Sequence, residues 1–222
     1  MKLFLDTAHT ADWTLPAGCA PIAGVTTNPS LVMQAGLAVS LPVYEALIAQ
    51  ASAAKIPALM LQLSSADSAL ALAWAKQLSA PESGVNLTFK LPCHPDWQAC
   101  HSALKRKGYA TLFTGVSNPM QLLWAHSQGA DWVAPYLSRM QASGRNVQHF
   151  IEACCAVQYD GGPKLMAASV KTPELLASLI AAGAAAVTIK PDFAASLAVD
   201  EMTLAAMAQF DEDCAASGLL NA

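Results

Sequence analysis

The amino-acid sequence predicts an α/β fold, a single (β/α)8 barrel of the TIM type followed by an extra C-terminal helix. Eight short apolar runs that favour β-structure recur along the chain, with alanine- and leucine-rich helical stretches between them. Such alternation implies parallel strands joined by helical crossovers. The length of 222 residues suits one barrel of this kind. A doubly wound open sheet is the alternative arrangement of the same elements.

The predicted elements follow one another regularly. The strands are expected at residues 2–6, 22–26, 58–62, 86–91, 110–114, 132–135, 165–169 and 186–189, and the helices at 42–54, 66–78, 96–107, 119–128, 147–157 and 173–182. No linker or low-complexity tract divides the chain, so residues 1–222 are expected to form one domain. Residues 200–222 read as a C-terminal helical tail, with Met202, Ala206 and Phe210 on one face.

Composition excludes several function classes. Hydrophobic residues make up 54% and charged residues 13% of the chain, which calls for a large core and for subunit interfaces. The net charge of -4 gives no basic footprint for nucleic acid. Asp6 comes too early for a secretory leader, and the longest apolar stretch, 175–189, is too short to span a bilayer. We therefore expect a cytoplasmic protein that does not enter membranes.

The six cysteines do not suggest a disulfide framework or a metal site. They are too sparse for a disulfide scaffold of this length. The pairs Cys93-His94 and Cys100-His101 invite a zinc interpretation, but their spacing matches no common zinc pattern. No bound metal is expected.

Lys90 lies inside the apolar run Asn-Leu-Thr-Phe-Lys-Leu-Pro at residues 86–92. Burial of a lysine disfavours its charged form, and a neutral amine is a nucleophile toward carbonyl carbons. Lys90 taken alone is better explained as a lysine that extends from a strand end to solvent. The rest of the chain favours the nucleophile.

Two loops resemble each other, Gly-Val-Thr-Thr-Asn-Pro at residues 24–29 and Gly-Val-Ser-Asn-Pro at 115–119. Asparagine followed by proline is typical of a helix N-cap and the first helical residue. Each pair is therefore expected to begin the helix after its strand. That structural explanation does not account for the hydroxyl groups that precede Asn28.

Polar residues gather where the predicted strands end, and in a barrel these ends share one face. They are Asp6, Thr26, Thr27, Asn28, Gln62, Lys90, Thr114, Tyr136, Arg139, Ser169, Lys171 and Lys190. Each alone has a structural explanation, such as a cap or a surface ion pair. Together they suggest carbonyl chemistry on a phosphorylated polyol, with lysine forming an imine and arginine binding phosphate. The chain lacks the GxxxxGK[ST] phosphate loop and the GxSxG elbow, and no cofactor is expected.

Several blocks resemble the small transaldolase family, which includes fructose-6-phosphate aldolase. They are Leu-Phe-Leu-Asp-Thr-Ala at 3–8, Gly-Val-Thr-Thr-Asn-Pro-Ser at 24–30, Lys-Leu-Pro at 90–92, Ala-Pro-Tyr at 134–136 with Arg139, Ala-Ala-Ser-Val-Lys-Thr-Pro at 167–173 and Gln-Phe-Asp-Glu-Asp at 209–213. In this family, transaldolases usually carry Glu after strand 3 and Phe in the strand 6 motif. Gln62 and Tyr136 resemble the aldolase branch instead.

The resemblance implies a class I aldolase that cleaves or forms fructose 6-phosphate from dihydroxyacetone and glyceraldehyde 3-phosphate. A transaldolase, which passes the dihydroxyacetone unit between sugar phosphates, is the close alternative, and a non-catalytic sugar-phosphate-binding barrel is the distant one. The implied roles can be given residue by residue. Lys90 forms the Schiff base, Asp6 handles a hydroxyl proton, Tyr136, Gln62 and Thr114 position water, Asn28 and Thr26 bind substrate, and Arg139 and Ser169 hold phosphate.

The resemblance also implies a homo-oligomer, a decamer of two pentameric rings with C-terminal helices that cross between subunits. Two positions depart from the family pattern. Ser117 stands where an aromatic residue is usual, so a wider or more hydrated pocket and a different acceptor aldehyde are expected. Lys190 stands at an apolar position, where it is either a second phosphate contact or a solvent-facing lysine.

Overall fold

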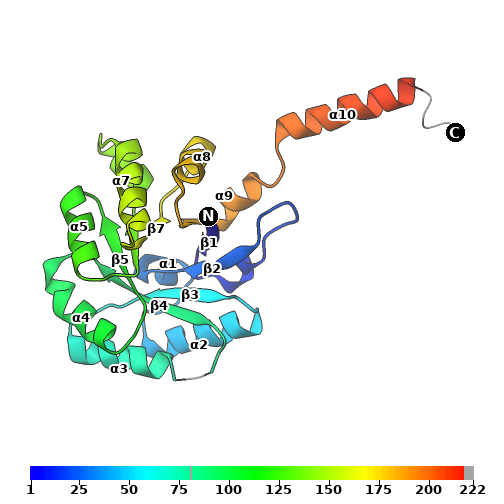
Figure 1. Cartoon of the computed structure of the whole chain (residues 1–222). Coiled ribbons are helices and arrows are strands. Elements are labelled where there is room, and N and C mark those ends of the chain that lie inside the picture. Colours follow the sequence, from blue (N-terminus) through cyan, green and yellow to red (C-terminus); the bar gives the residue numbers. More distant parts are fainter. Residues whose placement is uncertain (81, 218–222) are drawn as a thin grey trace.

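The computed structural model describes residues 1–80 and 82–217 and is a closed barrel of eight parallel strands (Figure 1). Strands adjacent in sequence pair with each other, and β8 pairs with β1 to close the sheet. The predicted barrel is confirmed, and the open-sheet alternative is wrong. The strands are β1 (Lys2–Asp6), β2 (Ile22–Thr26), β3 (Ala58–Gln62), β4 (Asn86–Pro92), β5 (Thr111–Val116), β6 (Trp132–Pro135), β7 (Lys164–Ala167) and β8 (Ala186–Ile189).

The helices other than α10 lie around the sheet (Figure 1). They are α1 (Pro29–Gln34), α2 (Leu41–Ala53), α3 (Ser68–Leu78), α4 (Gln98–Arg106), α5 (Pro119–Ser127), α6 (Leu137–Ala142), α7 (Val147–Tyr159), α8 (Pro173–Ala182), α9 (Pro191–Ser196) and α10 (Glu201–Ala216), with 3-10 turns η1 (Thr10–Trp13) and η2 (Pro95–Trp97). The six helices predicted between the strands correspond to α2, α3, α4, α5, α7 and α8. Within the two described ranges, no helix has the length and apolar character needed to cross a membrane.

Both Asn-Pro pairs begin helices, as predicted. The Asn28 side-chain oxygen accepts the Leu31 N–H at 3.1 Å, and Pro29 is the first residue of α1. The Asn118 side-chain oxygen accepts the Gln121 N–H at 3.0 Å at the start of α5. The loops are therefore capped in the same way although they follow different strands.

Three of the eight predicted strands have wrong boundaries: the fourth continues to Pro92, and the fifth and seventh differ at both ends. The seventh strand ends at Ala167 rather than at residue 169, because Ser169 has a φ of 56° and cannot continue an extended strand. The fifth strand continues to Val116 instead of ending at residue 114. Gly115 has a φ of 76°, and the pairing of β5 with β6 shifts register there, which is the geometry of a bulge.

The barrel interior is packed with side chains and requires a glycine on β2. Phe4, Met60, Leu112 and Met166 belong to a buried cluster separate from the larger core that includes helix residues. A Cβ atom at Gly24 would lie 2.6 Å from the Phe4 ring and 2.4 Å from the Ala58 carbonyl oxygen. Only glycine therefore fits, and this first residue of the Gly-Val-Thr-Thr-Asn-Pro block serves packing.

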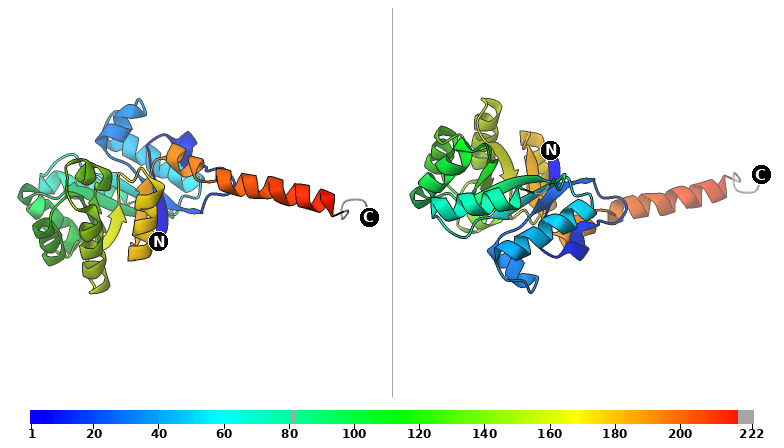
Figure 2. Two further views of the ribbon diagram at one scale, coloured as in Figure 1. Left: turned by 90° about the horizontal axis from the view of Figure 1, so that it is seen from above. Right: turned by 90° about the horizontal axis from the view of Figure 1, so that it is seen from below.

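Helix α10 extends away from the barrel (Figures 1 and 2). None of its residues is buried, and Met202 is 81% and Phe210 64% exposed. The possibility that the tail folds on its own barrel is therefore wrong for the described part of α10. Leu204 and Met207 are exposed too, so the apolar surface is wider than the predicted stripe. Residues 218–222 of the predicted tail lie outside the described residues.

Candidate active site

A cavity of about 720 Å³ opens at the carboxyl ends of the strands. Six of the nine predicted site residues line it: Asp6, Asn28, Gln62, Tyr136, Arg139 and Ser169. The other three, Thr26, Lys90 and Thr114, are buried beside these lining residues. The structure therefore brings all nine predicted residues to one end of the barrel, where barrel enzymes carry their chemistry.

Lys90 is a buried amine next to Gln62, which lines this cavity. It is 5% exposed, and its strand pairs it with Gln62 on β3 and Leu112 on β5. Its Nζ atom donates a hydrogen bond of 2.7 Å to the carbonyl oxygen of Thr27. Burial lowers the pKa of Lys90, and the negative charge of Asp6 opposes part of that effect. In its neutral form, which burial favours, the amine keeps a lone pair that the Thr27 carbonyl does not use and that can attack a carbonyl carbon.

Asp6 belongs to a line of three oxygen atoms. Thr26 Oγ1 donates to Asp6 Oδ1 at 2.8 Å, and Thr188 Oγ1 lies 2.6 Å from Thr26 Oγ1. Thr188 lines the cavity and is 3% exposed, yet the sequence analysis missed it. Thr188 stands one residue before the end of β8, whereas most of the predicted site residues stand at or after strand ends. The two-residue period of β8 places Thr188 on the same face as Ala186, which packs in the barrel interior, and this signal could have found it.

The Tyr136 side chain is held at two points, its hydroxyl and its ring. Its oxygen lies 2.7 Å from Thr114 Oγ1, so β5 and the residue after β6 meet through their hydroxyls. The guanidinium carbon of Arg139 lies 4.6 Å from the centre of the Tyr136 ring, a cation–π contact from the first helical turn of α6. Both lining residues are therefore held by each other and by the barrel wall.

Ser169 and Asn28 complete the predicted polar set. The left-handed backbone of Ser169 follows β7, and the Ser169 carbonyl oxygen accepts the Ser138 N–H at 3.0 Å. This bond ties the turn after β7 to α6. The oxygen of the Asn28 side chain caps α1, and its amide nitrogen makes no hydrogen bond within the described residues. That amide nitrogen is free to donate to a ligand.

Positive charges surround the outer part of the cavity. Arg139, Lys171 and Lys190 line it, together with the carboxylates of Asp6 and Asp192. Ser117 is not among the lining residues, and its hydroxyl donates to the Gln121 side chain at 3.2 Å. The structure therefore gives no support to the wider pocket expected from Ser117.

The cysteines and histidines flagged for zinc do not meet. Within residues 1–80 and 82–217, no group of three or more His, Cys, Asp or Glu side chains could hold a metal ion. Cys93 donates weakly to the Gln121 carbonyl, and His101 contacts Thr111. All six cysteines are free thiols, and burial raises the pKa of Cys93 and Cys100 to about 11.

Taken together, the site offers a buried nucleophilic amine, a carboxylate in a hydroxyl chain, a fixed phenol and a cluster of cations. A carbonyl compound with several hydroxyl groups and an anionic end would meet a complementary group at each point. Attack by Lys90 would produce an imine. The positive charge of an imine stabilises negative charge that develops on the neighbouring carbon atoms, as in the cleavage of a carbon–carbon bond.

Comparisons with known proteins agree with this fold. A family model described as Transaldolase/Fructose-6-phosphate aldolase matches residues 3–220. A solved structure described as "Native KDPGal structure" superposes with a TM-score of 0.57 at 15% sequence identity, covering 89% of this chain and 91% of that chain. At this identity the likeness concerns the fold alone.

Proposed function

The chain belongs to the transaldolase/fructose-6-phosphate aldolase family, and on that premise we propose that it is a class I aldolase acting on fructose 6-phosphate. The reaction is the reversible cleavage to dihydroxyacetone and glyceraldehyde 3-phosphate. The observation that carries the proposal is Lys90, a buried amine with a lowered pKa whose strand partner Gln62 lines a cavity with hydroxyl groups and cations. A solvated surface lysine would be protonated and unreactive at neutral pH.

In the proposed reaction, Lys90 attacks the ketone carbon C2 of the open-chain sugar, and loss of water gives an imine. The C4 hydroxyl gives up its proton and the C3–C4 bond breaks, which releases glyceraldehyde 3-phosphate. The electron pair of that bond forms an enamine with the carbon chain of dihydroxyacetone. Protonation at C3 and hydrolysis of the imine then release dihydroxyacetone and restore the amine.

Asp6 is suited to the proton of a substrate hydroxyl because it lines the cavity and acts electrostatically on Lys90. We propose that Tyr136, Gln62 and Thr114 position the water needed for proton transfer and hydrolysis. The 2.7 Å contact between the Tyr136 and Thr114 hydroxyls supports this, since it fixes the direction of the phenol. Asn28 and Thr26 are proposed to hold substrate hydroxyls, directly or through Asp6.

Arg139 and Ser169 are proposed to bind the phosphate. Arginine offers a forked set of donors that matches phosphate oxygens. The contact between Arg139 and the Tyr136 ring keeps the guanidinium near the cavity wall, although the side chain is exposed. Lys190 lines the same cavity, which favours the anion-contact interpretation over a lysine directed only to solvent.

Trapping the imine tests this proposal. Incubation with dihydroxyacetone and borohydride should add one reduced three-carbon unit, and peptide mass analysis should place it on Lys90. Lys90→Met should abolish it, whereas Lys76→Met, on the exposed face of α3, should not. Absence of label on an intact wild type would point to the non-catalytic binding barrel. Label without release of free dihydroxyacetone from fructose 6-phosphate would point to the transaldolase.

The assembly and location belong to the same proposal. The exposed apolar residues of α10 support packing against another copy of the chain, in the pentameric rings and decamers that the family resemblance implies. The six free cysteines suit the reducing cytoplasm.

A further inference from the structure

Thr188 has no role in the reaction proposed above, yet its hydroxyl lies in the cavity wall. It is 3% exposed on β8, and its Oγ1 atom lies 2.6 Å from Thr26 Oγ1. Thr26 on β2 in turn donates to Asp6 on β1 at 2.8 Å. Three side chains from three neighbouring strands thus form one continuous hydrogen-bonded chain where the barrel closes between β8 and β1.

The direction of this chain follows from counting protons. An ionised carboxylate only accepts hydrogen bonds, so the single proton of the Thr26 hydroxyl is committed to Asp6. Thr26 has no second proton to offer to Thr188. The 2.6 Å contact must therefore be donated by Thr188 and accepted by Thr26. Without Thr188, only the carboxylate would orient the Thr26 hydroxyl, whose oxygen would lose the donor that occupies its acceptor side.

We infer that Thr188 is a positioning residue for Asp6, which it holds through Thr26; this inference rests on the proposed aldolase function. The chain satisfies both protonation states of Asp6. When Asp6 carries a proton on Oδ1, it donates to Thr26, Thr26 donates to Thr188, and Thr188 donates into the cavity. The change requires only rotation of two hydroxyl groups, so the carboxylate keeps its place while it accepts and returns a substrate proton.

A purely structural threonine would behave differently. It would join β8 to β2 with the same effect whatever residue stands at position 6. A positioning residue loses its effect once Asp6 can no longer ionise. The distinction can therefore be measured in an Asp6→Asn background.

The experiment compares five variants of the full-length protein with wild type, namely Thr188→Val, Thr188→Ser, Asp6→Asn, the double variant Asp6→Asn/Thr188→Val and Thr88→Val. Valine keeps the shape of threonine and removes the hydroxyl, and serine keeps the hydroxyl. Thr88 is a matched control because it is a threonine buried in β4 that makes no side-chain hydrogen bond within the described residues. Each variant is assayed for dihydroxyacetone release, and its thermal unfolding is followed to verify folding.

Thr188→Val should lower kcat by on the order of tenfold, the size expected for one lost hydrogen bond, with KM nearly unchanged. Thr188→Ser should restore most of the rate, and Thr88→Val should match wild type. The double variant should be no slower than Asp6→Asn. A crystal structure of Thr188→Val should show the Thr26 hydroxyl turned away from Asp6 or divided between rotamers.

Three results would overturn the inference while the wild type remains active. The first is that Thr188→Val lowers kcat by the same factor in the Asp6→Asn background as in wild type. The second is that Thr188→Ser does not restore kcat. The third is an unchanged Thr26–Asp6 hydrogen bond in the Thr188→Val crystal structure. A wild type that neither traps an imine nor releases or transfers dihydroxyacetone would instead reject the proposed function, and this inference with it. The two failures are thereby distinguished.

Discussion

The amine of Lys90 lies 2.7 Å from the carbonyl oxygen of Thr27, so β4 is joined to the residue that follows β2. This contact is one of several that the Gly-Val-Thr-Thr-Asn-Pro block at residues 24–29 supplies to the site. Gly24 makes room for the Phe4 ring, Thr26 donates to Asp6, and Asn28 caps α1. Between them, Thr27 holds the amine with its backbone. One segment thus supports both the carboxylate and the nucleophile.

A single carbonyl oxygen cannot replace the water shell of an ammonium ion, and Lys90 should therefore reduce the stability of the fold. The unfolded chain binds a proton at Lys90 more readily than the folded chain, because burial lowers the pKa in the folded state. The stability should accordingly rise as the pH rises from the lowered pKa toward the ordinary lysine value.

Lys90→Met should abolish imine trapping and raise the free energy of unfolding at neutral pH by about 0.5–2 kcal/mol. Thermal or denaturant unfolding at several pH values measures this effect. The difference from wild type should shrink as the pH is raised, while Lys76→Met on exposed α3 should show no such trend. If Lys90→Met were less stable than wild type at every pH, the contacts of Lys90 in the folded state would offset the cost of burying its amine.

The same lowered pKa predicts the pH dependence of activity. The reactive form is the neutral amine, so kcat/KM should fall on the acid side as Lys90 becomes protonated. Steady-state rates of dihydroxyacetone release across the neutral and mildly acid range would measure this fall. If kcat/KM instead began to fall as soon as the pH dropped below about 10.4, the ordinary lysine value, the pKa of Lys90 would not be lowered.

The hydroxyl of Tyr136 should matter more for release of dihydroxyacetone than for its transfer. Tyr136→Phe removes the partner of Thr114 and leaves the ring under Arg139 in place. Loss of one catalytic hydrogen bond costs on the order of 2–4 kcal/mol in the barrier. Release from fructose 6-phosphate should drop accordingly, while transfer to an added aldehyde should survive better.

Tyr159→Phe is a suitable control, because Tyr159 is 96% exposed on α7. Thr114→Val should reproduce the Tyr136→Phe defect in part, since the phenol then loses the oxygen that orients it. If Tyr136→Phe lowers release and transfer by the same factor, the Tyr136 hydroxyl has a structural role in the site and does not position water.

Arg139 should recognise the phosphate of the substrate. Arg139→Ala should raise KM for fructose 6-phosphate by about tenfold or more, equivalent to one lost charge-assisted hydrogen bond, and should affect a neutral acceptor aldehyde much less. Arg145→Ala, an exposed arginine beyond the end of α6, should change neither value. Lys190→Ala should give a smaller increase in the same direction. Equal effects on charged and neutral substrates would argue against phosphate binding by Arg139.

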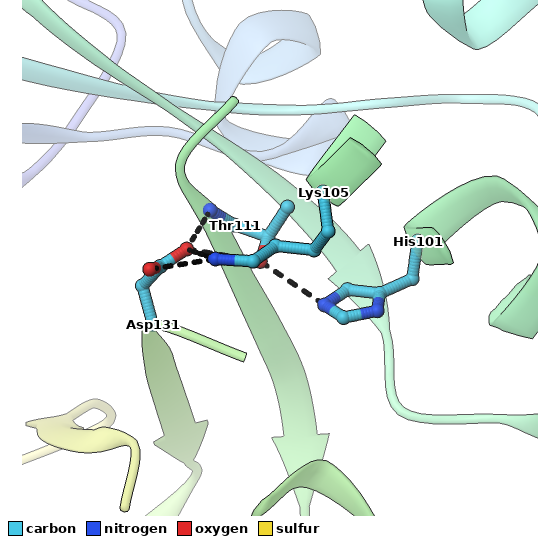
Figure 3. Close-up of polar contacts among 4 residues, drawn as sticks. All are labelled: His101, Lys105, Thr111 and Asp131. Carbon is cyan, nitrogen blue, oxygen red and sulfur yellow. Dashed lines mark hydrogen bonds and ion pairs between the residues drawn. The ribbon is translucent and has the colours of Figure 1, made fainter. Parts of the chain in front are cut away.

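A polar cluster at the opposite end of the barrel should control stability in acid (Figure 3). Asp131 accepts from Lys105 and from the Thr111 N–H at 2.8 Å, and His101 Nε2 lies 3.1 Å from Thr111 Oγ1. His101 is fully buried and stacks on Phe113 with ring centres 4.5 Å apart. Burial, aided by the charge of Lys105 and opposed by that of Asp131, lowers the pKa of His101 from 6.5 to about 4.

The folded state therefore binds the His101 proton less readily than the unfolded state. The contribution of neutral His101 to stability is fully present above about pH 6.5 and is lost as the pH falls toward 4. His101→Gln should flatten the dependence of the unfolding temperature on pH between these values. His149→Gln, an exposed histidine on α7, should leave the dependence as it is. Parallel curves for His101→Gln and wild type would assign the acid sensitivity to other groups.

Much of the fold followed from sequence because strand patterns and loop signals are local. Strands β1, β2, β3, β6 and β8 begin and end at the predicted residues. Barrel topology then brings strand ends together, which is why residues as distant as Asp6 and Ser169 could be grouped into one site. The short helices α1, α6 and α9 have six residues each, too few for an apolar period to be recognised. Only the start of α1 was predicted, from the Asn28-Pro29 pair.

The prediction failed at strand boundaries and site residues that depend on tertiary structure. The left-handed backbone of Ser169 ended β7 early, and Gly115 extended β5 through a bulge. Thr188 was overlooked because its importance comes from Thr26, a residue 162 positions away in sequence. The two-residue period of β8 places Thr188 on the interior face, but only the closed barrel shows that its partner there is Thr26.

Helix α10 provides the last prediction. Its exposed apolar residues, among them Met202, Met207 and Phe210, have no contact that buries them in the isolated chain. Exposed apolar area of this kind normally marks an interface. The helix begins at Glu201 after the barrel is closed, so its removal should leave the barrel folded.

We therefore expect full-length protein to form a ring-like homo-oligomer, and the chain truncated after Asp200 to dissociate into smaller species with the barrel's helical and strand content intact. Phe210→Glu should act like the truncation, because a carboxylate in an apolar contact is costly to bury. Gln209→Glu, its neighbour, adds the same charge to α10 and tests whether charge alone matters; it should keep the wild-type mass. Light scattering at micromolar concentration measures all four proteins. A monomeric mass for the full-length chain would show that the apolar face of α10 serves something other than a second copy.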